Sequence, residues 1–283
     1  MNSGYEKKNT IEILKNGKNG VGKHYFEFKT ESERFVDSPK ISVIIPVFQE
    51  EKILEKTLQK YSDILRTKYN FELIISDGGS TDRTIEIAQK YADIVVRHNE
   101  PRKQTIAEGR NKGASASRGD LLVFINADTV PENPELFFNF ISQLIDGKNK
   151  FSKFDALATR VYVAKDERLF KDLIFYFFHN FYVRLLNMIG LGMGRGECQI
   201  IKRTVFEKVG GYNPKIIAGE DFDLYKRISS VGSIGFVNEL VVLESPRRFR
   251  KYGYLRIIFS WVVNSLSVIF YGKSVSDEWE PVR

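Results

Sequence analysis

GDLLVFINADTVPENPE, residues 119–135, brings a single carboxylate to the end of a strand-like run. Residues 121–125 are continuously apolar, as in a strand covered on both faces of a sheet. Asp128 follows in a turn that leads into a helical segment. Taken alone, this carboxylate has two interpretations: it caps the next helix, or it binds Mg²⁺ or Mn²⁺, which prefer oxygen ligands.

Three further strands precede this stretch, at 41–47 (ISVIIPV), 71–77 (FELIISD) and 92–98 (ADIVVRH). Segments with helical spacing of apolar or small residues separate them, at 50–65, 80–92 and 105–118. This alternation is typical of βαβ units, whose right-handed crossovers place helices on both faces of a parallel sheet. The predicted fold is therefore α/β, with a Rossmann-like, mostly parallel sheet.

The second half of the chain has a different pattern. We expect strands at 155–165 and 234–245, a long aromatic helix at 169–191, and a helix at 220–232. GECQIIKRTVFEKVGGYNP, residues 196–214, is predicted to form a strand, a helix and a Gly-Gly turn. A final apolar helix at 254–272 follows the basic segment SPRRFRKYG, residues 245–253. Such a helix beside basic residues favours a place in the membrane interface or against a partner subunit.

Composition limits the classes of function. The 283 residues are 42% hydrophobic and 28% charged, which indicates a globular chain. The net charge of +7 suits acidic partners such as nucleotide phosphates or anionic lipid, but no nucleic-acid-binding motif is visible. The single cysteine, Cys198, excludes an internal disulfide, and the first twenty residues lack the apolar core of a signal peptide. The expected location is the cytoplasm, at the inner face of the cell membrane if residues 254–272 make contact there.

Three polar clusters, at residues 46–50, 77–82 and 126–129, lie at the carboxyl ends of predicted strands. Ligands of open α/β sheets bind at this edge, outside the carboxyl ends of the strands. The GxGxxG spacing of dinucleotide folds and the GK[ST] of P-loops are missing, which disfavours both classes. A fourth cluster, GEDFDL at 219–224, contains Glu220 and Asp221. These carboxylates either only complement a helix dipole or include a general base.

The order of PVFQEE, IISDGGSTDRT, GRNKGASASRGDLLVFINADT, GGYNP and GEDFDL resembles the family-2 glycosyltransferases of GT-A fold, over about residues 40–250. The resemblance implies an inverting transfer, of hexosyltransferase type, from a nucleotide-diphospho-sugar, with Mg²⁺ or Mn²⁺ as cofactor. Together with the composition of the two ends, it divides the chain into three regions: a partly flexible N-terminal extension (1–38), a catalytic domain (39–250) and a basic, apolar C-terminal helix and tail (251–283). The catalytic domain divides into a nucleotide-binding half (39–135) and an acceptor half (136–250).

The same resemblance assigns roles to individual residues. Asp128 is the metal ligand, Asp221 the catalytic base and Glu220 its neighbour and substitute. Donor-binding residues are Pro46, Val47, Glu50, Asp77, Lys103, Arg110, Asn126, Ala127, Arg247 and Arg248. Within this set, Asp77 meets the base, Lys103 and Arg110 approach the diphosphate, and the Arg247–Arg248 pair meets pyrophosphate or a phosphorylated acceptor.

Three departures from the family pattern change what we expect. The familiar DDGS is DGGS here, and the first acid of the DxD-like motif is Asn126. With one carboxylate instead of two, the metal should bind weakly until the donor's phosphates arrive. No multiple-span C-terminal domain follows in the sequence, which disfavours a polysaccharide synthase that extrudes its product.

Several alternatives remain open at this level. A nucleotidyltransferase uses a similar sheet and metal, and a non-catalytic nucleotide-sugar-binding or lipid-binding protein would share the cavity. The hydroxyl acceptor is a glycan or a lipid-linked molecule near the membrane, favoured by the aromatic helix at 169–191 and the apolar helix at 254–272. The oligomeric state is not indicated.

Overall fold

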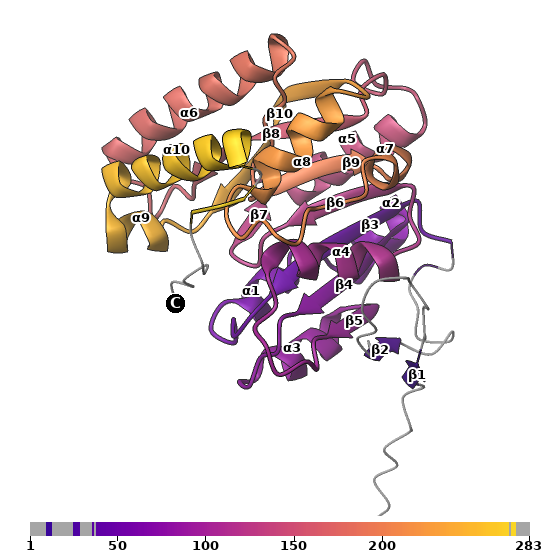
Figure 1. Ribbon diagram of the computed structural model, residues 1–283. Coiled ribbons are helices and arrows are strands. Elements are labelled where there is room, and N and C mark those ends of the chain that lie inside the picture. The colour runs from indigo at the N-terminus through magenta and orange to yellow at the C-terminus, as the bar shows by residue number, and fades with distance from the viewer. Residues whose placement is uncertain (1–9, 13–24, 29–35, 37, 272, 276–283) are drawn as a thin grey trace, which may run out of the picture.

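The computed structural model describes residues 10–12, 25–28, 36, 38–271 and 273–275. These residues form one ten-stranded mixed sheet with the order β1-β2-β5-β4-β3-β6-β9-β8-β10-β7 (Figure 1). The strands are β1 (Thr10–Glu12), β2 (Tyr25–Phe28), β3 (Ile41–Val47), β4 (Phe71–Asp77), β5 (Ile94–Arg97), β6 (Leu121–Ile125), β7 (Thr129–Pro131), β8 (Ala156–Val163), β9 (Cys198–Lys202) and β10 (Ile234–Glu244). Most of the predicted N-terminal extension lies outside the described residues.

The centre of the sheet is parallel, as predicted. β5, β4, β3 and β6 are neighbours with parallel pairing, and β8 pairs with β10 in the same way. β9 is antiparallel to both β6 and β8 and joins the two parallel groups. β2 lies between β1 and β5 and is antiparallel to both.

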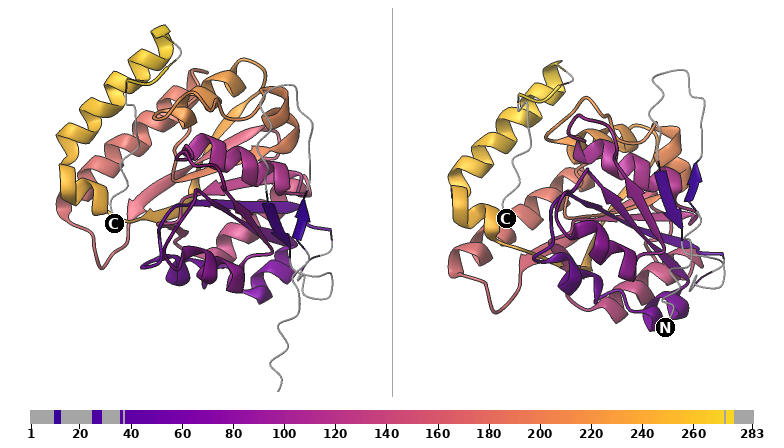
Figure 2. Two further views of the ribbon diagram at one scale, coloured as in Figure 1. Left: turned by 60° about the horizontal axis from the view of Figure 1, so that its bottom comes forward. Right: turned by 90° about the horizontal axis from the view of Figure 1, so that it is seen from below.

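Helices cover both faces of this sheet (Figure 2). They are α1 (Leu54–Leu58), α2 (Asp63–Tyr69), α3 (Thr84–Tyr91), α4 (Ile106–Ala116), α5 (Pro134–Ile145), α6 (Phe170–Met188), α7 (Arg203–Lys208), α8 (Glu220–Ser229), α9 (Arg247–Tyr252) and α10 (Tyr254–Tyr271). Buried residues of α1, α3 and α5 belong to one apolar core, and those of α4, α7 and α8 to a second. The predicted α/β fold with helices on both faces is confirmed.

One predicted helix is divided. Residues 50–65 form α1 and the start of α2 instead of one continuous helix. The Ser62 hydroxyl accepts a hydrogen bond from the Leu65 amide and so caps a new helix. Tyr61, just before it, is 3% exposed and packs edge-on against Phe138 of α5. Burial of this ring and the serine cap together turn the chain between the two helices.

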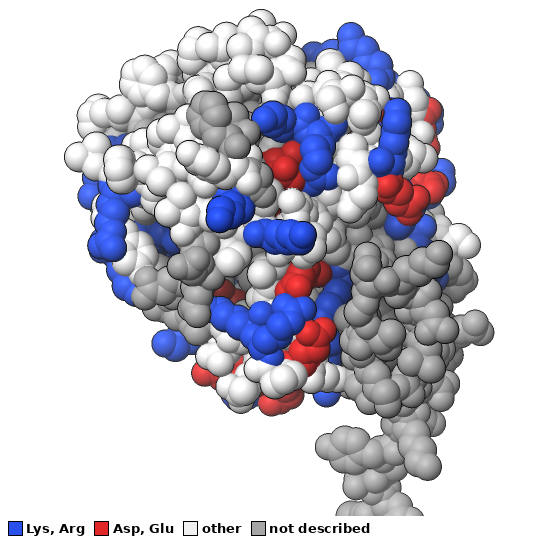
Figure 3. All heavy atoms as spheres, in the orientation of Figure 1, with Lys and Arg blue, Asp and Glu red and all other residues white. Residues whose placement is uncertain are grey.

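The long helices α6 and α10 lie side by side at one end of the molecule (Figures 1 and 2). Trp261 of α10 stacks near His179 and Phe175 of α6, with ring centroids 5.3 and 6.2 Å apart. A single residue, Gly253 with φ 76°, separates α9 from α10. The surface over α6 and α10 carries few charged side chains (Figure 3).

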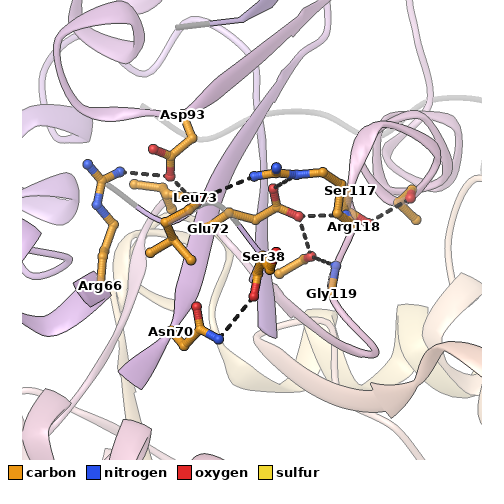
Figure 4. Close-up of polar contacts among 12 residues, drawn as sticks. Ser38, Arg66, Asn70, Glu72, Leu73, Asp93, Ser117, Arg118 and Gly119 are labelled. Atoms are coloured by element: carbon orange, nitrogen blue, oxygen red, sulfur yellow. Dashed lines mark hydrogen bonds and ion pairs between the residues drawn. The ribbon is translucent and has the colours of Figure 1, made fainter. Parts of the chain in front are cut away.

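Two buried carboxylates, Glu72 and Asp93, form hydrogen bonds and ion pairs near the amino ends of the central strands (Figure 4). Glu72 of β4 accepts from the Ser42 hydroxyl at 2.7 Å and from the Arg118 amide and Nε at 2.6 and 2.9 Å. Asp93 accepts from the Leu73 amide at 2.8 Å and from Arg66 Nη1 at 3.0 Å. These buried charges are paired and hydrogen-bonded, so they serve the packing of the sheet. They lie at the end opposite the clusters identified in the sequence.

Helix α4 lies close to β3 because Gly113 has no side chain. A Cβ atom at Gly113 would lie 2.4 Å from Cγ2 of the fully buried Ile44, whereas one at Gly109 would meet nothing closer than 3.7 Å. We therefore expect Gly113→Ala to lower the free energy of unfolding by about 1–3 kcal/mol through overpacking. Gly109→Ala, in the same helix, should be neutral or stabilising by about 0.5–1 kcal/mol. Urea denaturation of both variants measures the difference; equal stabilities would show that α4 shifts freely.

Candidate active site

Two adjacent cavities lie outside the carboxyl ends of β3, β4 and β6. The sheet-edge cavity, of about 410 Å³, is lined by Pro46, Val47, Phe48, Glu50, Lys103, Ala127 and Arg247 among others. The helix-roofed cavity, of about 430 Å³, is lined by Arg110, Glu197, Glu220, Asp221, Glu244 and residues of α9 and α10. Ile106, Asn126, Asp128 and Arg248 line both. The structure thus brings together every predicted site residue except Asp77.

The turns after β3 and β4 are joined by hydrogen bonds. The Gly78 amide donates to the Val47 carbonyl at 2.8 Å, and the Glu50 amide donates to the Thr84 hydroxyl at 2.7 Å. Asp77 is 1% exposed and its Oδ2 accepts from the Gly79 and Ser80 amides. Its Oδ1 has no hydrogen-bond partner among the described residues. Asp77 therefore shapes this turn, and a contact with a base stays a prediction.

Asp128 stands at the junction of the two cavities. Its Oδ2 accepts from Arg247 Nη2 at 3.2 Å, and the same guanidinium lies 3.5 Å from Glu50 Oε2. Desolvation raises the pKa of Asp128, and the charge of Arg247 opposes the rise. Helix α5 is capped by Asn133, whose side chain accepts from the Leu136 amide. The interpretation of Asp128 as a helix cap is therefore wrong.

The surroundings of Asp128 suit a hard cation with few protein ligands. The described residues contain no cluster of three or more His, Cys, Asp or Glu that could hold a metal. Asp128 keeps 31% of its side chain exposed at the cavity junction, and Asn126, two residues away, lines the same cavities. Mg²⁺ typically binds one or two carboxylates and completes its shell with water and phosphate oxygens. These residues fit such a partial site.

Arg110 is completely buried, in contrast to the expected approach to a diphosphate. Its Nη1 donates to Glu220 at 2.7 Å, and its Nη2 donates to Asn126 Oδ1 at 3.0 Å and to the Gly196 carbonyl at 2.8 Å. The guanidinium also lies 5.3 Å from the centre of the Tyr212 ring. In this structure Arg110 positions its neighbours, because each of its bonds joins α4 to another part of the site.

Asp221 opens α8 and faces the helix-roofed cavity. Its Oδ1 accepts from the Phe222 amide at 2.9 Å, while Oδ2 lies 3.7 Å from where a Cβ of Gly196 would stand. Burial first, and then the neighbouring charge of Glu220, raise the pKa of Asp221 to about 7, while Arg110 opposes the rise. A carboxylate with a pKa near neutrality is suited to general base catalysis.

A second buried charge cluster, which the sequence pattern did not predict, lies on this cavity. Arg195 lies 3.3 Å from Glu197 and 3.8 Å from Glu244, and its Nη1 donates to Asn180 of α6 at 3.0 Å. Arg195 lowers the pKa of Glu197 against the effect of burial, whereas burial and the charge of Glu197 raise that of Glu244. The signal that was available is the glycine-flanked GRGE, residues 194–197, immediately before β9.

Comparison with known proteins identifies the family. The model described as "Glycosyl transferase family 2" matches residues 42–210, more than half of the chain. The chain belongs to that family. The matched range includes Asn126 and Asp128 and ends before Glu220 and Asp221.

Similar proteins agree with this membership. The probable glycosyltransferase YdaM of Bacillus subtilis is 24% identical over 238 residues, 75% of this chain and 53% of that protein. A dolichyl N-acetyl-alpha-D-glucosaminyl phosphate 3-beta-D-2,3-diacetamido-2,3-dideoxy-beta-D-glucuronosyltransferase of Methanococcus voltae is 36% identical over 98 residues, 32% of this chain and 30% of that protein. The chain therefore spans only part of these relatives' length.

A solved structure shares the fold. The mannosyltransferase PcManGT from Pyrobaculum calidifontis, in complex with GDP-Man and Mn²⁺, superposes with a TM-score of 0.62 and covers 85% of this chain and 67% of that one. At 17% sequence identity, the likeness establishes the GT-A fold alone.

Proposed function

We propose that the protein transfers a sugar from a nucleotide-diphospho-sugar to a hydroxyl acceptor, with inversion at the anomeric carbon. The observation that carries this proposal is the position of Asp128 at the junction of two cavities, with Asp221 on the wall of the second. A donor in the sheet-edge cavity would thus have its reacting end beside Asp128, and an acceptor in the helix-roofed cavity would meet Asp221. Membership of family 2 and a solved relative that binds GDP-Man and Mn²⁺ support the same assignment.

The donor side rests on the turn after β3 and on nearby cations. Pro46, Val47 and Glu50 would contact the nucleoside, and Lys103 and Arg248, which line the same cavity, would face the diphosphate. Mg²⁺ or Mn²⁺, held by Asp128 with Asn126 nearby, would supply positive charge to the departing nucleoside diphosphate. Arg247, which pairs with Asp128 in this structure, would pair with the phosphates once the donor binds, because phosphate oxygens also accept hydrogen bonds from a guanidinium.

On the acceptor side, Asp221 removes the proton from the attacking hydroxyl. The hydroxyl oxygen forms a bond to the anomeric carbon from the face opposite the diphosphate. The bond from that carbon to the phosphate oxygen breaks, and its electron pair leaves with the nucleoside diphosphate. Glu220 is less suited to this role because its Oε1 is engaged by Arg110 at 2.7 Å.

The acceptor is, in our proposal, lipid-linked or close to a membrane, and the protein acts at the inner face of the cell membrane. Arg248 of α9 and Arg256 of α10 line the helix-roofed cavity and suit an acceptor that carries phosphate. The name of the Methanococcus relative describes a sugar–phosphate lipid as its acceptor, which supports this choice. No helix among the described residues is long and apolar enough to cross a membrane.

Replacing the proposed base tests the reaction directly. Asp221→Asn should lower the rate of sugar transfer about 10²-fold or more, because the amide cannot accept the proton, while donor binding survives. Asp223→Asn is the matched control: it makes the same change in the same helix at a carboxylate that pairs with Arg227. Single-turnover rates and calorimetry with donor separate chemistry from binding. Retained activity in Asp221→Asn would place the base elsewhere, with Glu220 the next residue to change.

The pH dependence of transfer should report the pKa of Asp221. Since only the ionised carboxylate is a base, kcat/KM should rise with pH and level off above a midpoint of about 7. Glu220→Gln removes a neighbouring negative charge that raises this pKa, so the rising limb should move to lower pH. A limb that stays in place, or moves to higher pH, would contradict the assignment.

Donor and metal should bind cooperatively. Mn²⁺ alone should stabilise the protein little, since Asp128 is the one carboxylate offered to it, whereas Mn²⁺ with the correct nucleotide sugar should raise the melting temperature clearly. A thermal-shift screen of UDP-sugars and GDP-sugars, with and without Mn²⁺, identifies the donor. Asp128→Asn should abolish the metal-dependent part of the shift and retain the part due to donor alone. Tight binding of Mn²⁺ to the free protein at this site would refute the expectation.

A further inference from the structure

Helix α6 has the reverse of the usual polarity of a surface helix. Such helices normally turn an apolar stripe to the core and a polar face to water. The buried residues of α6 are instead Asp172, Tyr176, Asn180, Val183 and Asn187. Their polar groups are satisfied inside the protein: Asn180 bonds both backbone groups of Val161, and Asn187 bonds both of Met193.

The opposite side of α6 is apolar and exposed. Phe170, Ile174, Phe177, Phe181, Leu185 and Met188 recur at intervals of three and four residues, so they form one stripe along the helix. Phe177 is 62% exposed, Phe181 60% and Met188 71%. Water contact by so many large apolar side chains on one helix is unfavourable unless another surface covers them.

Helix α10 repeats the pattern beside it. Its Asn264 and Ser267 are buried and bonded to the chain around them, at Ser260, Lys273 and Val275. Leu255, Phe259, Val262 and Leu266 form the exposed stripe. We refer to the exposed apolar side chains of residues 169–191 and α10 together as the α6–α10 face. Among the described residues, the large hydrophobic side chains exposed elsewhere are those of Ile64, Leu136, Val231 and Val275.

The charges around the α6–α10 face have one predominant sign. Between residues 245 and 275, Arg247 and Arg248 line the sheet-edge cavity and Arg250 pairs with Asp172. The exposed basic residues Lys251, Arg256 and Lys273 belong to the same segment, which contains no Asp or Glu. Within α6, Lys171 and Arg184 are exposed, while Asp172 is buried and paired with Arg250. The nearest exposed acids before α6, Asp166 and Glu167, lie in the turn that precedes it. An apolar face with a basic border is complementary to an anionic lipid surface.

We propose that the α6–α10 face binds the surface of an anionic lipid bilayer, with both helices lying in the interface and α6 contributing the larger apolar part. A second copy of the chain is the less suitable occupant, because a symmetric dimer through this face would bring two basic borders together. The sequence pattern placed residues 254–272 at the membrane interface and took the aromatic helix at 169–191 as support for an acceptor near the membrane. The structure adds that α6 itself turns an apolar face outward, and among the described side chains its exposed aromatic residues outnumber those of α10.

Docking in this way would place the helix-roofed cavity at the bilayer surface. Arg256, Ser260 and Trp261 of α10 line that cavity, while Leu255, Phe259 and Val262 of the same helix point outward. One helix thus separates the proposed lipid contact from Asp221. A lipid-linked acceptor would reach the cavity without leaving the bilayer, a consequence that rests on the proposed function. The docking itself does not depend on it.

Sedimentation of the full chain with vesicles tests the proposal without any sugar transfer. Vesicles of phosphatidylcholine alone are compared with vesicles that also contain phosphatidylglycerol. We expect binding to the anionic vesicles, and at least about tenfold weaker binding for Phe177→Asp/Phe181→Asp, since the two carboxylates oppose both insertion and charge attraction. Ile64→Asp/Leu136→Asp, which adds the same charge at exposed apolar residues of α2 and α5, is the matched control and should bind as the unchanged protein does.

A second variant tests the attraction between basic side chains of α6 and the anionic lipid. Lys171→Glu/Arg184→Glu should reduce the preference for phosphatidylglycerol while the melting temperature stays unchanged. Equal vesicle binding by the α6 variant and its control, or no binding by the unchanged protein, would overturn the proposal. Analytical ultracentrifugation tests whether a second copy of the chain occupies the face instead. If the unchanged protein does not bind vesicles but forms a dimer, and Phe177→Asp/Phe181→Asp dissociates that dimer, the face belongs to a second copy. The melting temperature of Phe177→Asp/Phe181→Asp is also measured with and without the nucleotide sugar. A normal increase with donor would show that donor binding is intact, so a loss of vesicle binding would not reflect a failure of the proposed reaction.

Discussion

The arrangement of the site depends on one buried charge. The Arg110 guanidinium has no exposed surface, and a charge taken out of water must be paired and hydrogen-bonded to be tolerated. Its partners come from three places distant in sequence: Asn126 after β6, the carbonyl of Gly196 before β9, and Glu220 at the start of α8. None of these segments can move away without leaving a buried donor or acceptor unsatisfied. Asp128 lies two residues after Asn126, and Asp221 directly follows Glu220, so the two carboxylates are held near each other.

The same charge explains why an amide at Asn126 suits this site. The helix-roofed cavity already holds the carboxylates of Asp128, Glu197, Glu220, Asp221 and Glu244. A further acid there would raise the cost of ionising its neighbours, because like charges at short range oppose each other. The Asn126 amide oxygen accepts from Arg110 without adding charge. Asn126 supplies no second carboxylate, so under the proposed function a metal on Asp128 would depend more on the phosphates of the donor.

Sequence patterns predicted the fold because they follow from the geometry of strands. Buried parallel strands need continuous apolar runs, and their carboxyl ends meet at one edge, which is why Pro46, Asn126 and Asp128 could be grouped before any coordinates were known. The patterns do not reveal the partner of a buried charge. Arg110 was therefore expected at the diphosphate, and the cluster of Arg195, Glu197 and Glu244 went unnoticed. Nor does spacing distinguish the two sides of α6: its apolar stripe is evident in the sequence, but that the stripe faces outward depends on the contacts of Asn180 and Asn187.

The short connection between α9 and α10 ties the position of α9 to that of α10. With only Gly253 between the helices, α9 can change its direction relative to α10 essentially by rotation about two backbone bonds. Arg247 and Arg248 lie at the far end of α9, so a small rotation at Gly253 displaces them by much more than it displaces Tyr252. Glycine keeps such rotations accessible where a larger residue would resist the positive φ. Such a rotation is opposed by two contacts, because Phe249 of α9 stacks on Tyr254 of α10 and Arg250 of α9 pairs with Asp172 of α6. Any surface that fixed α6 and α10 would therefore also fix Arg247 beside Asp128.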